Sequence, residues 1–219
     1  MRVHSPLKKT IRTGRFSCSS NSALPPITGA LALSATTPAF AGSGSPLFQT
    51  FRAAENSAYK CAQAAQAATT PDAGATENGL NACTMAINSA GANTDQLTGS
   101  LTNRSLLHMA RQEYDAAIAD STAALQIDAN LPDALVNRGV AQMLAGRPRD
   151  AITDLTRGLE RGPSFPERAY FNRAMAREDS GDYAGAYVDY RRASQLSPTW
   201  DRPKKELARF TVVPRTPTS

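Results

Sequence analysis

The chain has 219 residues, with 24 basic and 19 acidic side chains, and a formal net charge of +5 at pH 7. Five of the basic residues and none of the acidic ones lie in residues 1–41, so the rest of the chain is balanced at 19 of each sign. This balance argues against a nucleic-acid-binding protein, in which a basic excess would persist through the folded part. Aromatic residues make up only 6% of the chain and no stretch alternates like a strand, which favours an all-helical fold.

Residues 1–41 have the pattern of a secretory signal peptide. A basic start is followed by an apolar, small-residue stretch at 23–35 and by the Ala39-Phe40-Ala41 ending. An organelle transit peptide is also free of acidic residues and rich in Arg and Ser, and it remains the alternative. No run reaches 18 apolar residues, so no retained membrane segment is predicted. We therefore expect a periplasmic or secreted protein.

Residues 46–97 are predicted to form a degenerate N-terminal helical hairpin. Apolar residues recur at intervals of three and four over 46–68 and again over 80–89, with a Pro- and Gly-containing loop at 69–78. Cys61 and Cys83 fall on the two helices, which predicts a disulfide in an oxidising compartment. Two buried free thiols are the alternative in the cytosol. Their spacing lacks the further ligands of a zinc site, so no metal is expected.

A unit of about 34 residues, with two helical patterns split by a turn, recurs along the rest of the chain. The units are 98–131, 132–165 and 167–200, with helices expected at 98–111 and 114–127, 133–145 and 148–161, and 167–180 and 183–196. Residues that repeat at intervals of 34 or 35 are Ala117, Ala151 and Ala186; Ala124, Gly158 and Ala193; and Asn103-Arg104, Asn137-Arg138 and Asn172-Arg173. This period predicts a stacked array in which each hairpin buries the apolar face of its neighbour.

The third unit, 167–200, resembles a tetratricopeptide repeat. The matching residues are Tyr170, Ala174, Gly181, Tyr183, Ala186, Tyr190, Ala193 and Pro198. The other two units match less completely and depart from the pattern at Pro148, Ser121 and Ala129. The resemblance implies an all-α, right-handed array of antiparallel helix pairs, a tetratricopeptide-like solenoid of the exported bacterial type. It also implies that the partner is another protein or peptide.

The end of the chain is predicted to close the array. Residues 201–210 are expected to form a C-terminal capping helix, with Trp200, Leu207 and Phe210 turned inward, because a last repeat otherwise exposes an apolar face. Residues 211–219 contain two Pro and three Thr and are predicted to be a disordered tail.

An Arg and an Asp recur 16 residues apart in every unit. These pairs are Arg104 with Asp120, Arg138 with Asp154, and Arg173 with Asp189. We expect each to be a structural ion pair that joins the two helices of its unit; exposed charges of little energetic consequence are the alternative.

The resemblance also implies a concave groove lined by the first helix of each unit. Its predicted ligand-binding residues are Asn103, Leu106, Met109, Val136, Asn137, Val140, Met143, Arg168, Phe171, Asn172 and Met175. One Asn per unit offers donors and acceptors to a peptide backbone. The carboxylate clamp of the family is not expected, because Thr102, Leu106 and Asn172 stand where it differs.

No catalytic motif or cofactor-binding motif is found. His108 has neither a second His nor a nearby Cys, so a satisfied, partly buried histidine is expected there. The sequence therefore predicts a non-catalytic protein–protein interaction module that binds a peptide segment. The alternatives are a periplasmic holdase-type chaperone, and an accessory subunit or enzyme whose site the sequence does not reveal.

Overall fold

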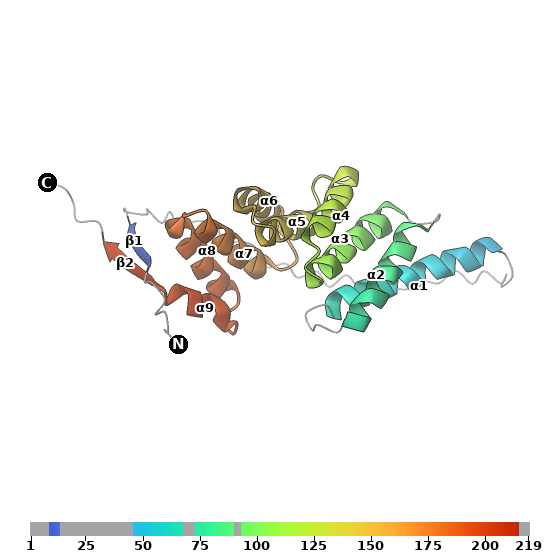
Figure 1. The fold of residues 1–219 in the computed structure, drawn as a ribbon, viewed down its shortest axis with the longest axis horizontal. Helices are drawn as coiled ribbons and strands as arrows, with labels where there is room; N and C mark the ends of the chain where they lie inside the picture. The colour runs from blue at the N-terminus through green and yellow to red at the C-terminus, as the bar shows by residue number, and fades with distance from the viewer. Residues whose placement is uncertain (1–8, 14–45, 68–72, 90–92, 215–219) are drawn as a thin grey trace, which may run out of the picture.

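The computed structural model describes residues 9–13, 46–67, 73–89 and 93–214. Within these ranges the chain forms eight helices in four consecutive antiparallel pairs, a short ninth helix and two short strands (Figure 1). The pairs are α1 (Pro46–Ala67) with α2 (Ala73–Ile87), α3 (Thr94–Ala110) with α4 (Tyr114–Ile127), α5 (Pro132–Leu144) with α6 (Pro148–Glu160), and α7 (Pro166–Asp179) with α8 (Tyr183–Leu196). The predicted all-α array of helix pairs is confirmed.

The ends of the helices follow the local sequence. Helices α5, α6 and α7 each begin with Pro in the first turn, where the missing N–H has no intrahelical acceptor to lose. Gly146 and Gly181 close the turns before α6 and α8 with φ angles of 76° and 85°. The corresponding turn before α4 uses Gln112, with φ of 62°, which is an uncommon conformation for a residue with a side chain.

Small residues let the helices of a pair approach closely. Ala117, Ala151 and Ala186 have no exposed surface. A Cβ added at Gly139 would lie 3.1 Å from the carbonyl oxygen of Ala151, and one added at Gly158 would lie 3.2 Å from that of Pro132. Larger side chains at these positions would push the backbones apart.

The N-terminal hairpin forms, but with different boundaries. Helix α2 begins at Ala73 rather than at residue 80, so the predicted loop at 69–78 is wrong from residue 73 onward. Gly79 is a packing position within α2, because an added Cβ would lie 2.4 Å from the Cβ of Ala64. Helix α3 likewise begins at Thr94 rather than 98, since the side chain of Asn93 accepts a hydrogen bond from the N–H of Gln96 at 2.8 Å.

The structure joins Cys61 to Cys83, as the sequence predicted. Their Cα atoms are 4.6 Å apart, and both residues are fully buried against Leu107 of α3. The disulfide therefore closes the first hairpin at its contact with the second.

The C-terminal end differs most from the sequence-based expectation. The capping helix α9 spans Asp201–Leu207, and the chain then extends as strand β2 (Phe210–Pro214). The predicted disordered tail is wrong for residues 211–214; residues 215–219 lie outside the described ranges. Phe210 starts the strand because its ring packs 5.9 Å from that of Tyr187 and 6.1 Å from that of Tyr190, while Thr and Val favour extended backbone.

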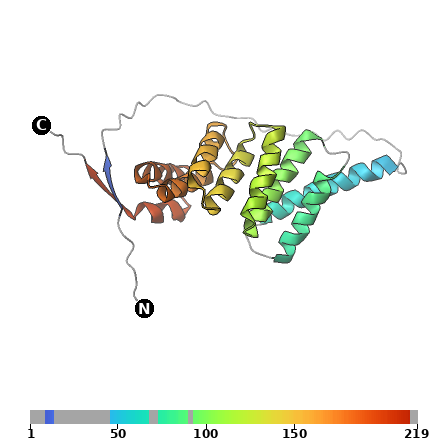
Figure 2. The same ribbon diagram turned by 45° about the horizontal axis from the view of Figure 1, so that its top comes forward.

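Strand β2 pairs in parallel with β1 (Lys9–Thr13), which lies within the predicted signal peptide (Figure 2). The rest of residues 1–41 lies outside the described ranges. In the part of the chain that the structure describes, no helix combines the length and the apolar character needed to cross a membrane.

We predict that the Cys61–Cys83 disulfide stabilises the fold. Closing a loop of 22 residues should contribute about 3 kcal/mol, mainly by restricting the unfolded chain. Replacing both cysteines by Ser should lower the free energy of unfolding by that amount in urea titrations. Intact mass after alkylation of the isolated protein reports the bond itself. Two alkylated thiols at these positions would contradict the prediction.

We predict that Tyr190 makes the stability of the fold sensitive to alkaline pH. Burial raises the pKa of the Tyr190 phenol, and its hydrogen bond to Glu178 Oε2 at 2.7 Å raises it further. The unfolded chain loses this proton near about pH 10 while the folded chain keeps it, so stability is complete below that pH and falls above it. The stability advantage of the natural chain over Tyr190→Phe should therefore shrink between about pH 8 and about pH 10.5.

Urea titrations at the two pH values measure this difference. Tyr59→Phe, at a side chain that is 63% exposed, controls for the loss of a tyrosine hydroxyl. An advantage that stays constant with pH would show that the fold does not hold the Tyr190 proton.

Candidate protein-binding groove

The structure brings together all three Arg–Asp pairs that the spacing pointed to. Each guanidinium donates two parallel hydrogen bonds to its carboxylate, with Nε–Oδ2 distances of 2.7 Å for Arg104, 2.7 Å for Arg138 and 2.8 Å for Arg173. In Arg104 and in Arg138, these hydrogen bonds raise the pKa of the guanidinium group above the ordinary value for arginine. The pairs link the two helices within α3–α4, α5–α6 and α7–α8.

Each arginine also reaches the preceding helix pair, a contact that the sequence analysis missed. The Nη1 atom donates to a threonine hydroxyl on the second helix of that pair: Thr84 at 3.1 Å from Arg104, Thr122 at 3.5 Å from Arg138 and Thr156 at 3.1 Å from Arg173. Thr122 lies two residues after Asp120, and Thr156 lies two residues after Asp154. This threonine therefore recurs with the 34-residue period and could have been found from the sequence. Successive pairs are thus linked by an Asp–Arg–Thr chain, which describes a structural rather than a ligand-binding role.

His108 is partly buried and has two acidic neighbours. Its Nδ1 lies 2.7 Å from Glu113 Oε2 and its Nε2 lies 3.6 Å from Asp120 Oδ2. The hydrogen bond with His108 is the main cause of a lowered pKa at the Glu113 carboxyl. His108 therefore ties the α3–α4 turn to the first Arg–Asp pair.

The three Asn side chains that were predicted to face a bound peptide do not all line the groove. Asn137 is only 8% exposed, and its Nδ2 donates to the carbonyl oxygen of Thr102 at 3.2 Å and to Ser105 Oγ at 3.3 Å. It therefore links α5 to α3, and its Nδ2 donors are already used within the fold. The prediction failed because Ser105, its partner, lies 32 residues away in sequence. Asn103 and Asn172 are partly buried and keep surface toward solvent.

Two predicted apolar residues of the groove belong to the core instead. Met143 is 8% exposed and packs with Leu155 and Ala176. Phe171 is 3% exposed, because the Trp200 ring from the start of α9 covers it at a centroid distance of 4.9 Å. The remaining predicted apolar residues stay partly buried: Leu106, Met109, Val136, Val140 and Met175. Three of these, Val136, Val140 and Met175, also pack against the core.

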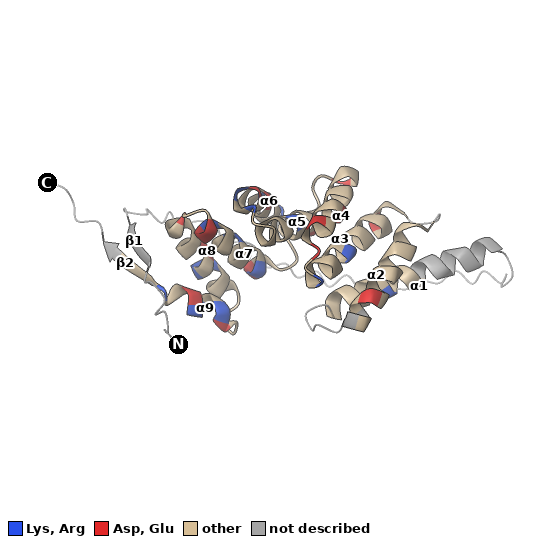
Figure 3. Ribbon diagram, in the orientation of Figure 1, with Lys and Arg blue, Asp and Glu red and all other residues tan. Residues whose placement is uncertain are grey.

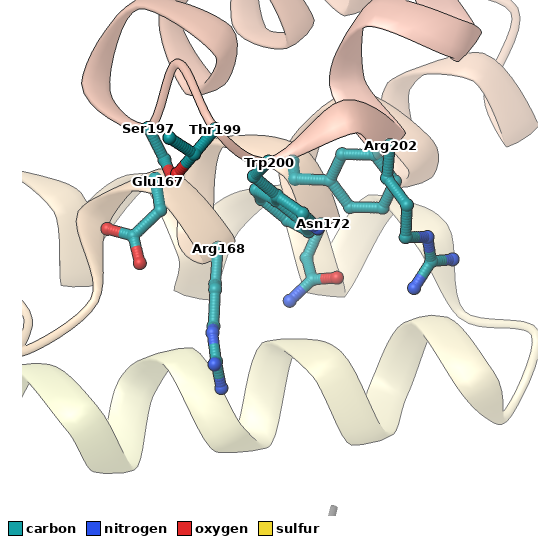
Figure 4. A pocket seen from close by; sticks show the side chains of 8 residues that line it. Glu167, Arg168, Asn172, Ser197, Thr199, Trp200 and Arg202 are labelled. Atoms are coloured by element: carbon teal, nitrogen blue, oxygen red, sulfur yellow. The ribbon is translucent and has the colours of Figure 1, made fainter.

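A hollow of about 580 Å³ lies between α7 and the α8–α9 junction. It is lined by Glu167, Arg168, Phe171, Asn172, Ser197, Thr199, Trp200 and Arg202. The side chains of Arg168, Asn172 and Arg202 point the same way, away from their helices, with Asn172 between the two guanidinium groups (Figure 4). The sequence does not predict Trp200 and Arg202 as site residues, because residues 201–210 are predicted only to form a capping helix.

The two arginines of this hollow have no carboxylate partner among the described residues. Arg168 lies over the Phe165 ring at 4.9 Å and Arg202 lies over the Phe171 ring at 5.0 Å, so aromatic faces position both cations. Elsewhere, basic and acidic residues are both scattered over the described helices (Figure 3). Within the described ranges, no cluster of three or more His, Cys, Asp or Glu side chains has the arrangement of a metal site.

Comparison with known families identifies the repeat. The model for the tetratricopeptide repeat matches residues 167–199, which are helices α7 and α8 and the turn that follows. Residues 167–199 therefore match a tetratricopeptide repeat. Helix pairs α3–α4 and α5–α6 repeat the same spacing of small residues and the same Arg–Asp pair. The α5–α6 pair packs against α7, and α3–α4 packs against α5.

Solved structures show the same tetratricopeptide-repeat fold. The crystal structure of MamA superposes with a TM-score of 0.53 at 16% identity, over 61% of this chain and 75% of MamA. A MamA RS-1 double mutant gives 0.58 at 15% identity, over 72% and 81%. A tetratricopeptide repeat protein from Parabacteroides merdae gives 0.56 at 18% identity, over 72% and 59%. Identity this low establishes the fold alone. No curated protein matches the chain.

We predict that the Arg138–Asp154 pair contributes strongly to stability. Its side chains are 19% and 6% exposed, so removing one partner leaves the other charge buried without compensation. Arg138→Met or Asp154→Asn alone should cost about 3 kcal/mol. In urea titrations, the double-mutant cycle should give a coupling energy of about 1 kcal/mol or more.

The matched control is the Arg147–Asp115 pair. Its atoms are 2.9 Å apart, but its side chains are 50% and 84% exposed, so its coupling should stay below about 0.5 kcal/mol. Equal coupling in the two cycles would show that burial does not strengthen the repeated pair.

Proposed function

We propose that this protein is a non-catalytic interaction module that binds an extended, acidic peptide segment of another protein. The supporting observation is the hollow beside α7, where Arg168 and Arg202 flank the amide of Asn172. Guanidinium groups held on aromatic faces, without a carboxylate of their own, are suited to bind the carboxylate of a ligand. The ligand therefore carries an Asp, a Glu or a free carboxyl terminus at this position.

Apolar residues along the first helices extend the site toward the middle of the array. Leu106 and Met109 on α3 and Val136 and Val140 on α5 keep part of their surface exposed. Each apolar side chain that a peptide covers adds affinity, and Met adapts to side chains of different shape. We infer that the charged hollow fixes the position of the peptide and that these residues add affinity without strict selection.

The structure favours this function over a holdase-type chaperone. A holdase needs a continuous apolar surface for unfolded chains, whereas Met143 and Phe171 are withdrawn into the core. Trp200 fills the apolar floor of the groove at the last repeat and leaves a polar, charged rim. A rim of this kind selects ligands by charge rather than by general hydrophobicity.

We also propose that the protein works in an oxidising compartment, the periplasm or the medium. The Cys61–Cys83 disulfide supports this, because such bonds persist outside the reducing cytosol. The basic and then apolar pattern of residues 1–41 supports export independently.

We predict that acidic peptides bind at the hollow. On an array of ten-residue peptides that differ in Asp and Glu content and in a free or amidated end, binding should require a carboxylate and weaken as salt is added. Arg168→Glu combined with Arg202→Glu should lower the affinity for a selected peptide by at least about tenfold, or about 1.4 kcal/mol. Asn172→Ala should give a smaller loss with an unchanged melting temperature.

The matched control is Arg191→Glu combined with Arg192→Glu, which reverses the charge of two exposed residues of α8 that do not line the hollow. It makes the same change in net charge and should alter affinity less than about threefold. Equal losses in both double variants would show attraction by net charge alone. Binding that does not depend on peptide carboxylates would contradict the proposed ligand.

A further inference from the structure

The C-terminal end of the array presents a strand whose partner comes from the beginning of the chain. Strands β1 and β2 pair in parallel, with Lys9 opposite Phe210, Ile11 opposite Val212 and Thr13 opposite Pro214. The two strands lie side by side beyond α8 and α9 in both views (Figures 1 and 2). Almost the whole chain separates them in sequence, so no tight turn enforces this pairing.

Strand β2 is held in place by the array itself. It follows α9 after two residues, and its first residue, Phe210, packs against the rings of Tyr187 and Tyr190 on α8. Arg209 adds ion pairs with Glu206 and with Glu178 of α7. These contacts do not involve β1, so the last repeat and its cap position the start of β2 at Phe210.

Strand β1 pairs with β2 along its whole length and also lies against α8. Its sequence, Lys-Thr-Ile-Arg-Thr, contains three β-branched residues and no Pro, which suits an added strand. A two-stranded ribbon is marginally stable by itself. Release of the segment would therefore break the strand pairing and its contact with α8 while leaving the helix pairs intact.

We propose that β2 is a strand-addition site whose ligand is the segment Lys9–Thr13. In the full chain, the chain's own residues 9–13 occupy this site. When they are released, the edge of β2 is free to pair with the same sequence on a separate molecule. Main-chain hydrogen bonds give such a site its affinity, and the ligand it fits is an extended, proline-free strand. If residues 1–41 are removed on export, processing uncovers the site. The proposal is independent of the charged hollow beside α7.

The first experiment tests the pairing in the full chain. In a Cys18→Ser background, Ile11→Cys combined with Val212→Cys places the two cysteines at paired positions. Mild oxidation should cross-link them at least about tenfold faster than the control combination of Ile11→Cys with Leu144→Cys, an exposed residue of α5. Equal rates for the two combinations would overturn the proposal.

The second experiment tests exchange. Full chains with Ile11→Pro and with Arg12→Pro are prepared separately, because only alternate N–H groups of β1 face β2 and one of the two changes removes a ladder bond. A fluorescent peptide of residues 5–17 should bind the variant that releases the segment at least about tenfold more tightly than it binds the natural chain. Circular dichroism should show unchanged helix content in both variants.

Two further peptides separate strand addition from attraction of a basic peptide. The same peptide with the releasing proline, and a scrambled peptide of equal charge, should each bind at least about tenfold more weakly. Comparable binding of the scrambled peptide, or equal affinity of the original peptide for the natural chain and both proline variants, would overturn the proposal.

Discussion

Close approach of the two helices in each pair is the constraint on which the rest of this fold depends. It requires small residues where backbones meet, as at Gly139 beneath Leu155 and Gly158 beneath Val136. Only at this spacing does an arginine on the first helix reach a carboxylate on the second with two bonds of 2.7–2.9 Å. The repeated ion pair is thus a consequence of helix packing, and the small residues and the charges cannot vary independently.

The threonine contacts of the same arginines extend this dependence to neighbouring units. Because Arg138 donates to Asp154 within its own helix pair and to Thr122 in the preceding one, loss of the arginine affects both packing interfaces. Asn137 makes a second link across the interface with α3. In repeat proteins, stability is close to a sum of unit and interface terms, so polar links of this kind couple the unfolding of adjacent units.

The sequence predicted features that recur at a fixed interval and missed those that depend on a single spatial neighbour. Helix pairs, turn glycines and the partners of Arg104, Arg138 and Arg173 follow from the 34-residue period. The groove was predicted less well, since burial of Phe171 depends on Trp200 from beyond the repeats. Gly79 and strand β2 are two further features whose structure depends on a neighbour that is distant in sequence. A glycine and a proline-containing tail both suggest irregular structure until the helix or ring that they pack against is known.

The two ends of the array are closed by different means. The N-terminal pair is fixed by a buried disulfide, whereas the C-terminal pair is covered by Trp200 and Phe210. The charged hollow combines Arg168 and Asn172 of the last repeat with Trp200 and Arg202 of the cap, so it exists only while α9 is docked. A ligand that binds both parts must therefore stabilise the docked cap, because ligand binding stabilises whichever state contains the site. Closure of the array and binding at its end are then one linked equilibrium.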